Sequence, residues 1–360
     1  MRLIHIFLLI PILFFSCKNA TEKVKQDFMP LARGEADEII LVMDSAQYKG
    51  ALGDEIRGIY QQYMKILNQD EYEFSMSKIN PLKMNTVFRN AKNLIFVMTL
   101  DSRTRESRAV REYFTDESLK MIDRDTSLFY TVRRDEFAKG QVVLYLFGKT
   151  EDQLVKKMHE NVDGLKDLFE SVVKERIKDD MLAKTKKQVI KAITEDHGYE
   201  IQVPFGWDLA KNVNDFIWLR RLEAQSEQNV FVYETKYDDP DFYQHIDEIR
   251  DQITSVYLRD SQKPDKYIER QEIVPTYTKR ISFKDKFALE ARGLWKISDN
   301  SAGGPYVSYT FVDEPNQKLY YIEGYVYAPG TKKKKLMREV DALLNTFKTP
   351  SEMSPSGANQ

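Results

Sequence analysis

The stretch QVVLYLFGKTEDQLVKKM, residues 141–158, shows how the chain is organised. Its first part, Gln141 to Phe147, is an apolar run rich in β-branched and aromatic residues, which is typical of a buried strand. Gly148 ends the strand, and Thr150 is placed to cap the helix that follows. That helix is amphipathic, because apolar residues recur at three- and four-residue spacing from Leu154 to Phe169. A strand that leads directly into such a helix predicts a sheet packed by helices.

The same order recurs near the end of the chain. Residues Gly324 to Phe347 give a strand, a Pro-Gly turn, a threonine and a helix. A duplicated α+β unit would explain this likeness. The arrangement of strand, cap and helix is a common local solution that would also arise without duplication, so the sequence does not establish a repeat.

Two apolar runs before residue 141, Ile39–Met43 and Leu94–Leu100, predict buried strands with an amphipathic helix between them. Helical spacing after residue 151 continues to about Glu195, which as one helix would measure roughly 65 Å. Because this length exceeds the width of a compact domain, we expect a break within 178–187. Residues 39–195 are therefore predicted to form an N-terminal α+β domain that ends in a long helical stretch.

From Tyr199 the chain changes to short β-type runs separated by turns. A helix is expected at Asp241–Leu258, followed by strands at Phe287–Ile297, Tyr306–Val312 and Leu319–Tyr327 and by a closing helix. Residues 196–348 are predicted to form a C-terminal α+β domain, with a disordered tail at 349–360. The expected fold class is α+β, with two domains, each a mainly antiparallel sheet packed by helices, joined through the long helical stretch.

The amino terminus, MRLIHIFLLIPILFFSC, has the pattern of a secretory signal that ends at the only cysteine of the chain. Its apolar core is shorter than the roughly twenty residues that a membrane-spanning helix needs. We expect residues 1–16 to be a signal peptide, Cys17 to be acylated, and residues 17–38 to be a flexible tether. Lys18 in place of aspartate favours the outer membrane. The alternative is that Cys17 is an incidental thiol behind an ordinary signal or a short membrane anchor.

Composition and motifs argue against several classes of function. The net charge of −2 gives no bulk attraction to nucleic acid, so no nucleic-acid partner is expected. The four histidines, His5, His159, His197 and His245, lie far apart, and no cysteine is available to complete a site, so no metal is expected. The sequence contains no phosphate-binding or nucleophile motif, and we expect neither a cofactor nor an identifiable catalytic residue.

The best candidate binding surface lies on the last three predicted strands. If their registers align, polar and aromatic side chains would line an open sheet face: Glu290, Arg292, Trp295, Tyr306, Ser308, Glu323 and Tyr325. The alternative is cross-strand ion pairing and ordinary aromatic packing. A third possibility is that Glu290 and Glu323 form the acid and base of a hydrolase, although Arg292 would tend to keep both ionised.

Several segments resemble an uncharacterised family of Bacteroidetes lipoproteins, a domain of unknown function. They are Met43-Asp44-Ser45, Gly293-Leu294-Trp295, Gly303 to Tyr309 and Glu323 to Gly330. The likeness covers nearly the whole chain after the signal and implies no activity. The second half, from Tyr199 onward, is similar to the PsbP/Mog1-type α+β sandwich in its order of elements. Most members of that fold bind proteins, so the likeness favours a binding module.

Three functions compete. We favour a lipid-anchored, non-catalytic binding or scaffold module of the cell envelope, held in the membrane by its acyl chains, with a protein or glycan partner. The first alternative is an envelope hydrolase with a site assembled in the C-terminal domain, which predicts one deep pocket. The second is an assembly chaperone for envelope proteins, which predicts an exposed strand edge or groove.

Acylation of Cys17 is directly testable. Labelling with a palmitate analogue is expected to mark the wild-type chain and not Cys17→Ala, because no other thiol is present. Equal labelling of both chains would contradict the lipoprotein interpretation.

Overall fold

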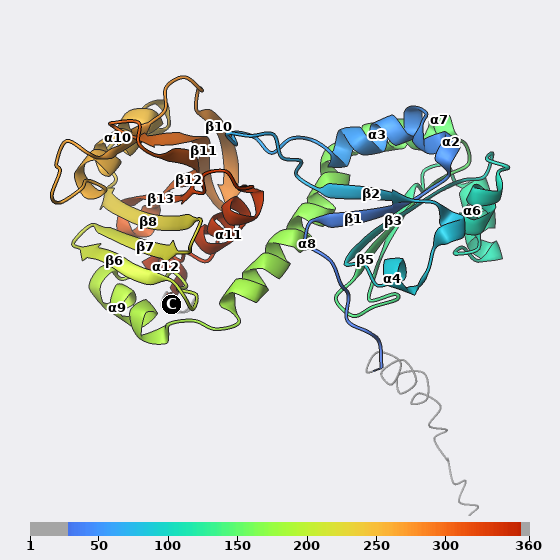
Figure 1. Cartoon of the computed structure of the whole chain (residues 1–360), viewed down its shortest axis with the longest axis horizontal. Coiled ribbons are helices and arrows are strands. Elements are labelled where there is room, and N and C mark those ends of the chain that lie inside the picture. The colour runs from blue at the N-terminus through green and yellow to red at the C-terminus, as the bar shows by residue number, and fades with distance from the viewer. Residues whose placement is uncertain (1–27, 354–360) are drawn as a thin grey trace, which may run out of the picture. The chain divides into compact units, whose positions relative to one another are not determined.

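The protein, seen in a computed structural model, is described over residues 28–353, which form two compact units (Figure 1). Unit 1 comprises the chain up to residue 61 together with 74–165, and unit 2 comprises 62–73 and the chain from 166 onward. The mixed α+β class expected from the sequence is confirmed. Within residues 28–353, none of the helices is both long and apolar enough to cross a membrane. The predicted signal and Cys17 lie outside the described residues.

Unit 1 contains a five-stranded sheet in the order β2-β1-β3-β5-β4. Its strands are β1 Glu38–Val42, β2 Ser75–Ile79, β3 Asn93–Thr99, β4 Tyr130–Arg134 and β5 Val142–Gly148. All pairs are parallel except β4 with β5, so the prediction of a mainly antiparallel sheet is wrong for this unit. The physical reason is that helices connect the parallel strands, as crossovers require, whereas a short loop joins β4 to β5.

Helices cover both faces of this sheet. They are α2 Ser45–Tyr48, α3 Ala51–Tyr60, η1 Pro81–Lys83, α4 Thr86–Arg89, α5 Arg105–Arg111, α6 Asp116–Arg124, α7 Glu151–His159 and the start of α8 Val162–Leu182. One set of alternate strand residues packs with Val110 of α5 and Ile122 of α6. Thr150 caps α7 as predicted, its hydroxyl accepting from the Gln153 N–H. Strands β3 and β5 are buried along their whole length, which makes them the centre of the unit.

Unit 2 contains an eight-stranded antiparallel sheet in the order β10-β11-β12-β13-β8-β7-β6, with β9 beside β11. Its strands are β6 Asp208–Val213, β7 Phe216–Leu222, β8 Glu227–Lys236, β9 Ile268–Arg270, β10 Tyr277–Phe283, β11 Lys286–Ile297, β12 Gly303–Asp313 and β13 Lys318–Tyr327. The antiparallel prediction is confirmed for this unit. The strand, turn and helix at 141–158 lie on a mainly parallel sheet, whereas those at 324–347 lie on an antiparallel sheet. The likeness of these two segments therefore does not extend to the sheets that contain them.

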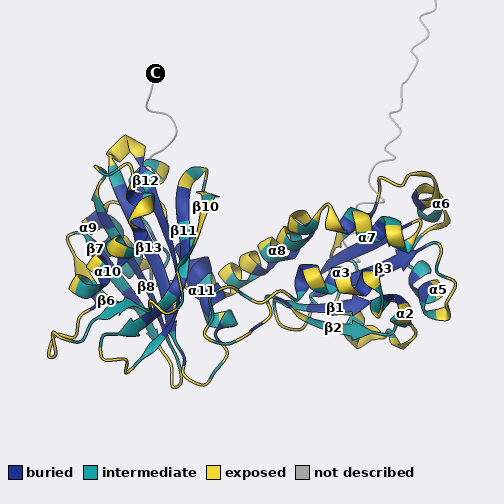
Figure 2. Ribbon diagram, turned by 90° about the horizontal axis from the view of Figure 1, so that it is seen from above, coloured by how far each residue is buried: buried dark blue, intermediate teal, exposed yellow. Residues whose placement is uncertain are grey.

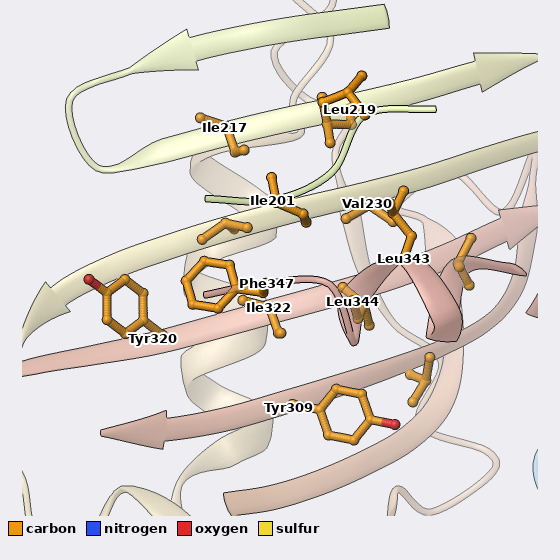
Figure 3. Packing of buried hydrophobic residues seen from close by; sticks show 14 of the residues in the cluster. Ile201, Ile217, Leu219, Val230, Tyr309, Tyr320, Ile322, Leu343, Leu344 and Phe347 are labelled. Atoms are coloured by element: carbon orange, nitrogen blue, oxygen red, sulfur yellow. The ribbon is translucent and has the colours of Figure 1, made fainter. Parts of the chain in front are cut away.

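The sheet of unit 2 also has two covered faces. Its helices are α9 Lys187–His197, η2 Phe242–Gln244, α10 Ile246–Tyr257, η3 Glu314–Asn316, α11 Lys334–Leu344 and α12 Pro350–Met353. One face packs on α9 and α11, where Leu343, Leu344 and Phe347 meet Tyr320 and Ile322 (Figure 3). The opposite face packs on α10 through Ile246 and Ile253. Figure 2 shows the resulting burial of the central strands in both sheets.

Three expectations about connecting segments can be compared with the structure. The break expected within 178–187 is present, because α8 ends at Leu182 and α9 begins at Lys187. The predicted tether extends too far, since Leu31 and Arg33 already form bridges with Lys139 and Ala91. The predicted tail begins too early, because 350–353 are helical. The carboxylate of Glu352 accepts from the Thr349 N–H and pairs with Lys286, at 2.7 and 2.8 Å.

Candidate functional site

The residues predicted to share one open face of the last three strands lie on two opposite faces of the sheet. Glu290 and Arg292 face α11, whereas Trp295, Tyr306, Ser308, Glu323 and Tyr325 face α10. All five on the α10 side are buried. The predicted open surface is therefore absent. The acid and base pair suggested for a hydrolase is excluded as well, because Glu290 and Glu323 are separated by the sheet.

On the α10 side, Glu323 is held by an arginine that the sequence analysis missed. Arg250 of α10 donates from Nε and Nη2 to the two Glu323 carboxylate oxygens, at 2.9 and 2.8 Å. The Tyr321 hydroxyl donates to the same carboxylate at 2.6 Å, and the guanidinium lies 4.1 Å from the centre of the Tyr306 ring. A signal was available, because Arg250 stands between Ile246 and Ile253 on the apolar stripe of its helix.

On the α11 side, Arg292 belongs to a half-buried charged cluster. It pairs with Glu290 on its own strand, and its Nη2 lies 3.7 Å from Oδ2 of Asp341 on α11. The Tyr309 hydroxyl donates to Asp341, whose carboxylate also lies 3.8 Å from Lys174 Nζ on α8. Burial alone would raise the pKa of Asp341, but the charges of Lys174 and Arg292 hold it below its ordinary value. These contacts tie α8, α11 and the sheet together, so they stabilise the unit.

A different part of the molecule offers space for a ligand. Unit 1 holds a cavity of about 300 Å³ between α6 and the β4–β5 side of the sheet. We call its lining the aromatic pocket: Tyr113, Phe114, Ser118, Met121, Ile122, Leu128, Tyr130, Thr131, Arg133, Tyr145 and Phe147. Its volume is at the lower end of the range for small-molecule sites, and its lining is mainly apolar, as in such sites.

The aromatic pocket exists because α6 covers the sheet incompletely. This helix begins after Thr115, whose hydroxyl accepts from the Ser118 N–H, and it places a single buried residue, Ile122, on the core. Met121 and Leu128 remain 56% and 36% exposed beside the cavity. The floor is rigid, because Phe114 packs edge-on against Tyr145 and Phe147 of β5, with ring centres 5.4 and 5.8 Å apart.

Polar groups gather on one side of the aromatic pocket. The Arg133 guanidinium lies 5.4 Å from the centre of the Tyr145 ring and donates from Nη1 to Oε1 of Glu136 at 3.0 Å. The Tyr145 hydroxyl and the Glu136 Oε2 atom are both buried from solvent, and the Glu136 carboxylate is the acceptor that the Tyr145 hydroxyl faces. Burial, together with the nearby Glu136 charge, raises the pKa of Tyr145, so its hydroxyl stays protonated. On this side of the pocket, Arg133 and Tyr145 are therefore both engaged with Glu136.

Sequence reasoning did not identify this pocket. Residues 105–124, which are dense in charge, form α5, α6 and their connecting turn. Arg111 is turned inward and donates to the carbonyl oxygens of Thr99, Leu100 and Ser102. A local signal was available in the adjacent aromatic residues Tyr113 and Phe114, which stand in a stretch dense in charge.

The fold and pocket thus define a two-unit α+β protein with a ligand-sized cavity in its first unit. Residues 32–182 match the family model described as Domain of unknown function (DUF8532), and residues 186–346 match Domain of unknown function (DUF4837). The predicted resemblance to uncharacterised families is confirmed, with two family models where the sequence suggested one. No curated protein matches the chain.

Some solved structures resemble part of the chain. A mutant of the protein Mog1 is 9% identical with a TM-score of 0.27, and the Saccharomyces cerevisiae Ran-binding protein Mog1p is 10% identical with a TM-score of 0.26. Both matches cover 42% of this chain and 90% of the other. A Bacteroides thetaiotaomicron protein is 11% identical with a TM-score of 0.19, covering 42% of this chain and 44% of its own. These similarities agree with the Mog1-type resemblance and carry no inference about function.

Arg292→Ala is expected to destabilise unit 2 by about 2 kcal/mol, because it removes the cation that pairs with the half-buried Glu290 and leaves Lys174 as the remaining cation beside the buried Asp341. The measurement is denaturant unfolding followed by tryptophan fluorescence, which reports this unit because Trp207, Trp218 and Trp295 all lie in it. The matched control is Lys191→Ala, whose exposed pair with Glu195 should contribute less than about 1 kcal/mol. Equal stability of both variants would show that the cluster is not structural.

Proposed function

We propose that this protein is a lipid-anchored, non-catalytic binding module of the cell envelope that captures its ligand in the aromatic pocket of unit 1. The anchor is Cys17, and the membrane is the outer membrane. The observation that carries the binding role is a ligand-sized, mainly apolar cavity with a rigid aromatic floor and with Met121 and Leu128 exposed beside it. The partner is an envelope component that presents a small apolar group.

The pocket replaces the C-terminal strands as the expected site of binding. In unit 2 the aromatic side chains proposed as a surface are engaged in packing between the sheet and α10. In unit 1, Tyr145 and Phe147 line a cavity, and such rings offer a large apolar contact area. We therefore move the expected site of binding from the C-terminal strands to the aromatic pocket.

Binding of an apolar group can be tested with the neutral fluorophore N-phenyl-1-naphthylamine and the full chain in a non-ionic detergent. Met121→Arg introduces a charge into the pocket lining and should weaken saturable binding by roughly tenfold or more. The matched control is Val87→Arg, the same kind of change at a residue of unit 1 that is 78% exposed and outside the pocket. It should bind as the wild type does.

Detergent alone also takes up the dye, so the difference between the two arginine variants is the decisive quantity. A saturable component in wild type and Val87→Arg that is lost in Met121→Arg supports the proposal. Identical titrations of all three chains would overturn it.

A further inference from the structure

We propose that the ligand of the aromatic pocket is an extended peptide segment of another envelope protein, which adds as a strand to the free edge of β4 and places one bulky apolar side chain in the cavity. This inference rests on the proposed function and adds the class of partner. Two observations carry it: the outer edge of β4 has no neighbouring strand in the described chain, and the same strand forms one wall of the cavity. Main-chain pairing and a side-chain pocket are the two parts of strand-addition sites.

The outer edge of β4 presents a row of main-chain hydrogen-bonding groups. β4 is the last strand of its sheet and pairs with β5 alone. Just beyond the strand, the Asp135 N–H donates to the Gln141 carbonyl oxygen, so by alternation the odd-numbered residues of β4 bond to β5. The residues whose N–H and C=O groups point outward, where no described residue bonds to them, are Tyr130, Val132 and Arg134. Such an edge is a template for another strand.

The cavity adjoins this edge on one face of β4. Thr131 and Arg133 line it, and they share that face with their cross-strand partners Tyr145 and Val143. Thr131 is small and exposed, and Met121 of α6 is 56% exposed, so the cavity opens where these two side chains lie. A residue of an added strand opposite Thr131 would have its Cβ about 5 Å away on the same face. A long apolar side chain at that position reaches the cavity.

Charge at the carboxyl end of β4 selects the peptide further. Arg134 is exposed, and its side chain has no ion pair or hydrogen bond with a described residue. The nearest carboxylates in sequence are already engaged, Glu136 by Arg133 and Asp135 by main-chain N–H groups of the turn. An acidic residue opposite Arg134 therefore adds a favourable cross-strand pair. In antiparallel pairing, the more stable mode, this acidic residue precedes the apolar residue by three positions.

The chain itself offers no suitable occupant beside this edge. Residues 18–27 precede the segment that bridges to Lys139 in the β4–β5 turn, but their only apolar side chains are Ala20 and Val24. These are too small to fill about 300 Å³. A second copy paired through β4 would turn only Thr131 and Arg133 toward the cavity, and neither is bulky and apolar. A segment of a different protein is therefore the occupant that fits.

The test uses the full chain in a non-ionic detergent and the probe acetyl-SETVFTS-amide. In the antiparallel register its glutamate lies opposite Arg134, its valine opposite Val132 and its phenylalanine opposite Thr131. Binding is measured by calorimetry and by displacement of N-phenyl-1-naphthylamine. The probe should bind saturably and displace the dye from wild type. Met121→Arg, which obstructs the cavity, should weaken probe binding by roughly tenfold or more.

Methylation of the probe backbone separates strand addition from simple uptake of the phenylalanine side chain. The valine N–H of the bound probe bonds to the Val132 carbonyl oxygen, whereas the phenylalanine N–H points away from β4. Methylation of the valine nitrogen should weaken binding by about tenfold. The matched probe, methylated on the phenylalanine nitrogen, should bind as the parent does. Replacing the glutamate by lysine should weaken binding to wild type severalfold, and Arg134→Glu should restore it.

The outcomes separate this inference from the proposed function. If the two methylated probes bind with equal affinity, or if the dye binds saturably and no probe displaces it, strand addition is overturned while the pocket remains a binding site. Equal affinity of the glutamate and lysine probes would contradict the charge assignment. If neither dye nor probe binds, the binding role of the pocket fails as well.

Two further outcomes would assign the edge of β4 to this protein itself and overturn the proposal. One is a chain that is dimeric by analytical ultracentrifugation and binds the probe only as the dimer dissociates. The other is probe binding that appears only after deletion of residues 18–27. Unchanged circular dichroism of each variant controls for folding.

Discussion

The structure of both units depends on central strands that are buried on both faces. In unit 1 these are β3 and β5, and in unit 2 they include β12 and β13, nearly all of whose residues are buried. A polar side chain on such a strand has no water to bind and must find its partner within the protein. In unit 2, Arg250 of α10 forms an ion pair with Glu323, and Asp341 of α11 forms one with Arg292. Paired in this way, the charges fix how each helix sits on the sheet and are unavailable to an outside ligand.

The same constraint explains why the cavity lies where it does. A strand covered completely on both faces leaves no space, so a pocket forms where the covering layer is thin. Over β5, the covering helix α6 contributes one fully buried residue, Ile122, and the partly buried Leu119 to the core, and a cavity remains beside Tyr145 and Phe147. The neighbouring edge strand β4 brings Arg133 to the rim. An aromatic floor, an open side and an arginine at the rim distinguish this pocket from the closed packing of the C-terminal strands.

Local sequence signals predicted the elements of this fold well and their assembly less well. The run Gln141–Phe147 and the cap at Thr150 reproduce β5 and α7 closely, because strand propensity and capping are properties of neighbouring residues. Alternation also placed Glu290 and Arg292 on one side of β11, and Tyr306 and Ser308 together on β12. Whether these two pairs share a face of the sheet depends on the strand register. Arg292 lies directly opposite Val307, so these two side chains share one face and the side chains of Tyr306 and Ser308 lie on the other. Register, strand direction and the thin cover over β5 arise from contacts distant in sequence, which spacing alone does not encode.

We propose that ligands bind in unit 1, whereas the aromatic residues of the C-terminal strands in unit 2 are structural. Amide hydrogen exchange of the full chain, measured with and without saturating N-phenyl-1-naphthylamine, tests this most directly because it reports both units at once. The account predicts slower exchange in peptides that span residues 113–122 and 128–147, with no change over residues 286–327. Protection confined to residues 286–327 would contradict it and return the binding site to the C-terminal strands.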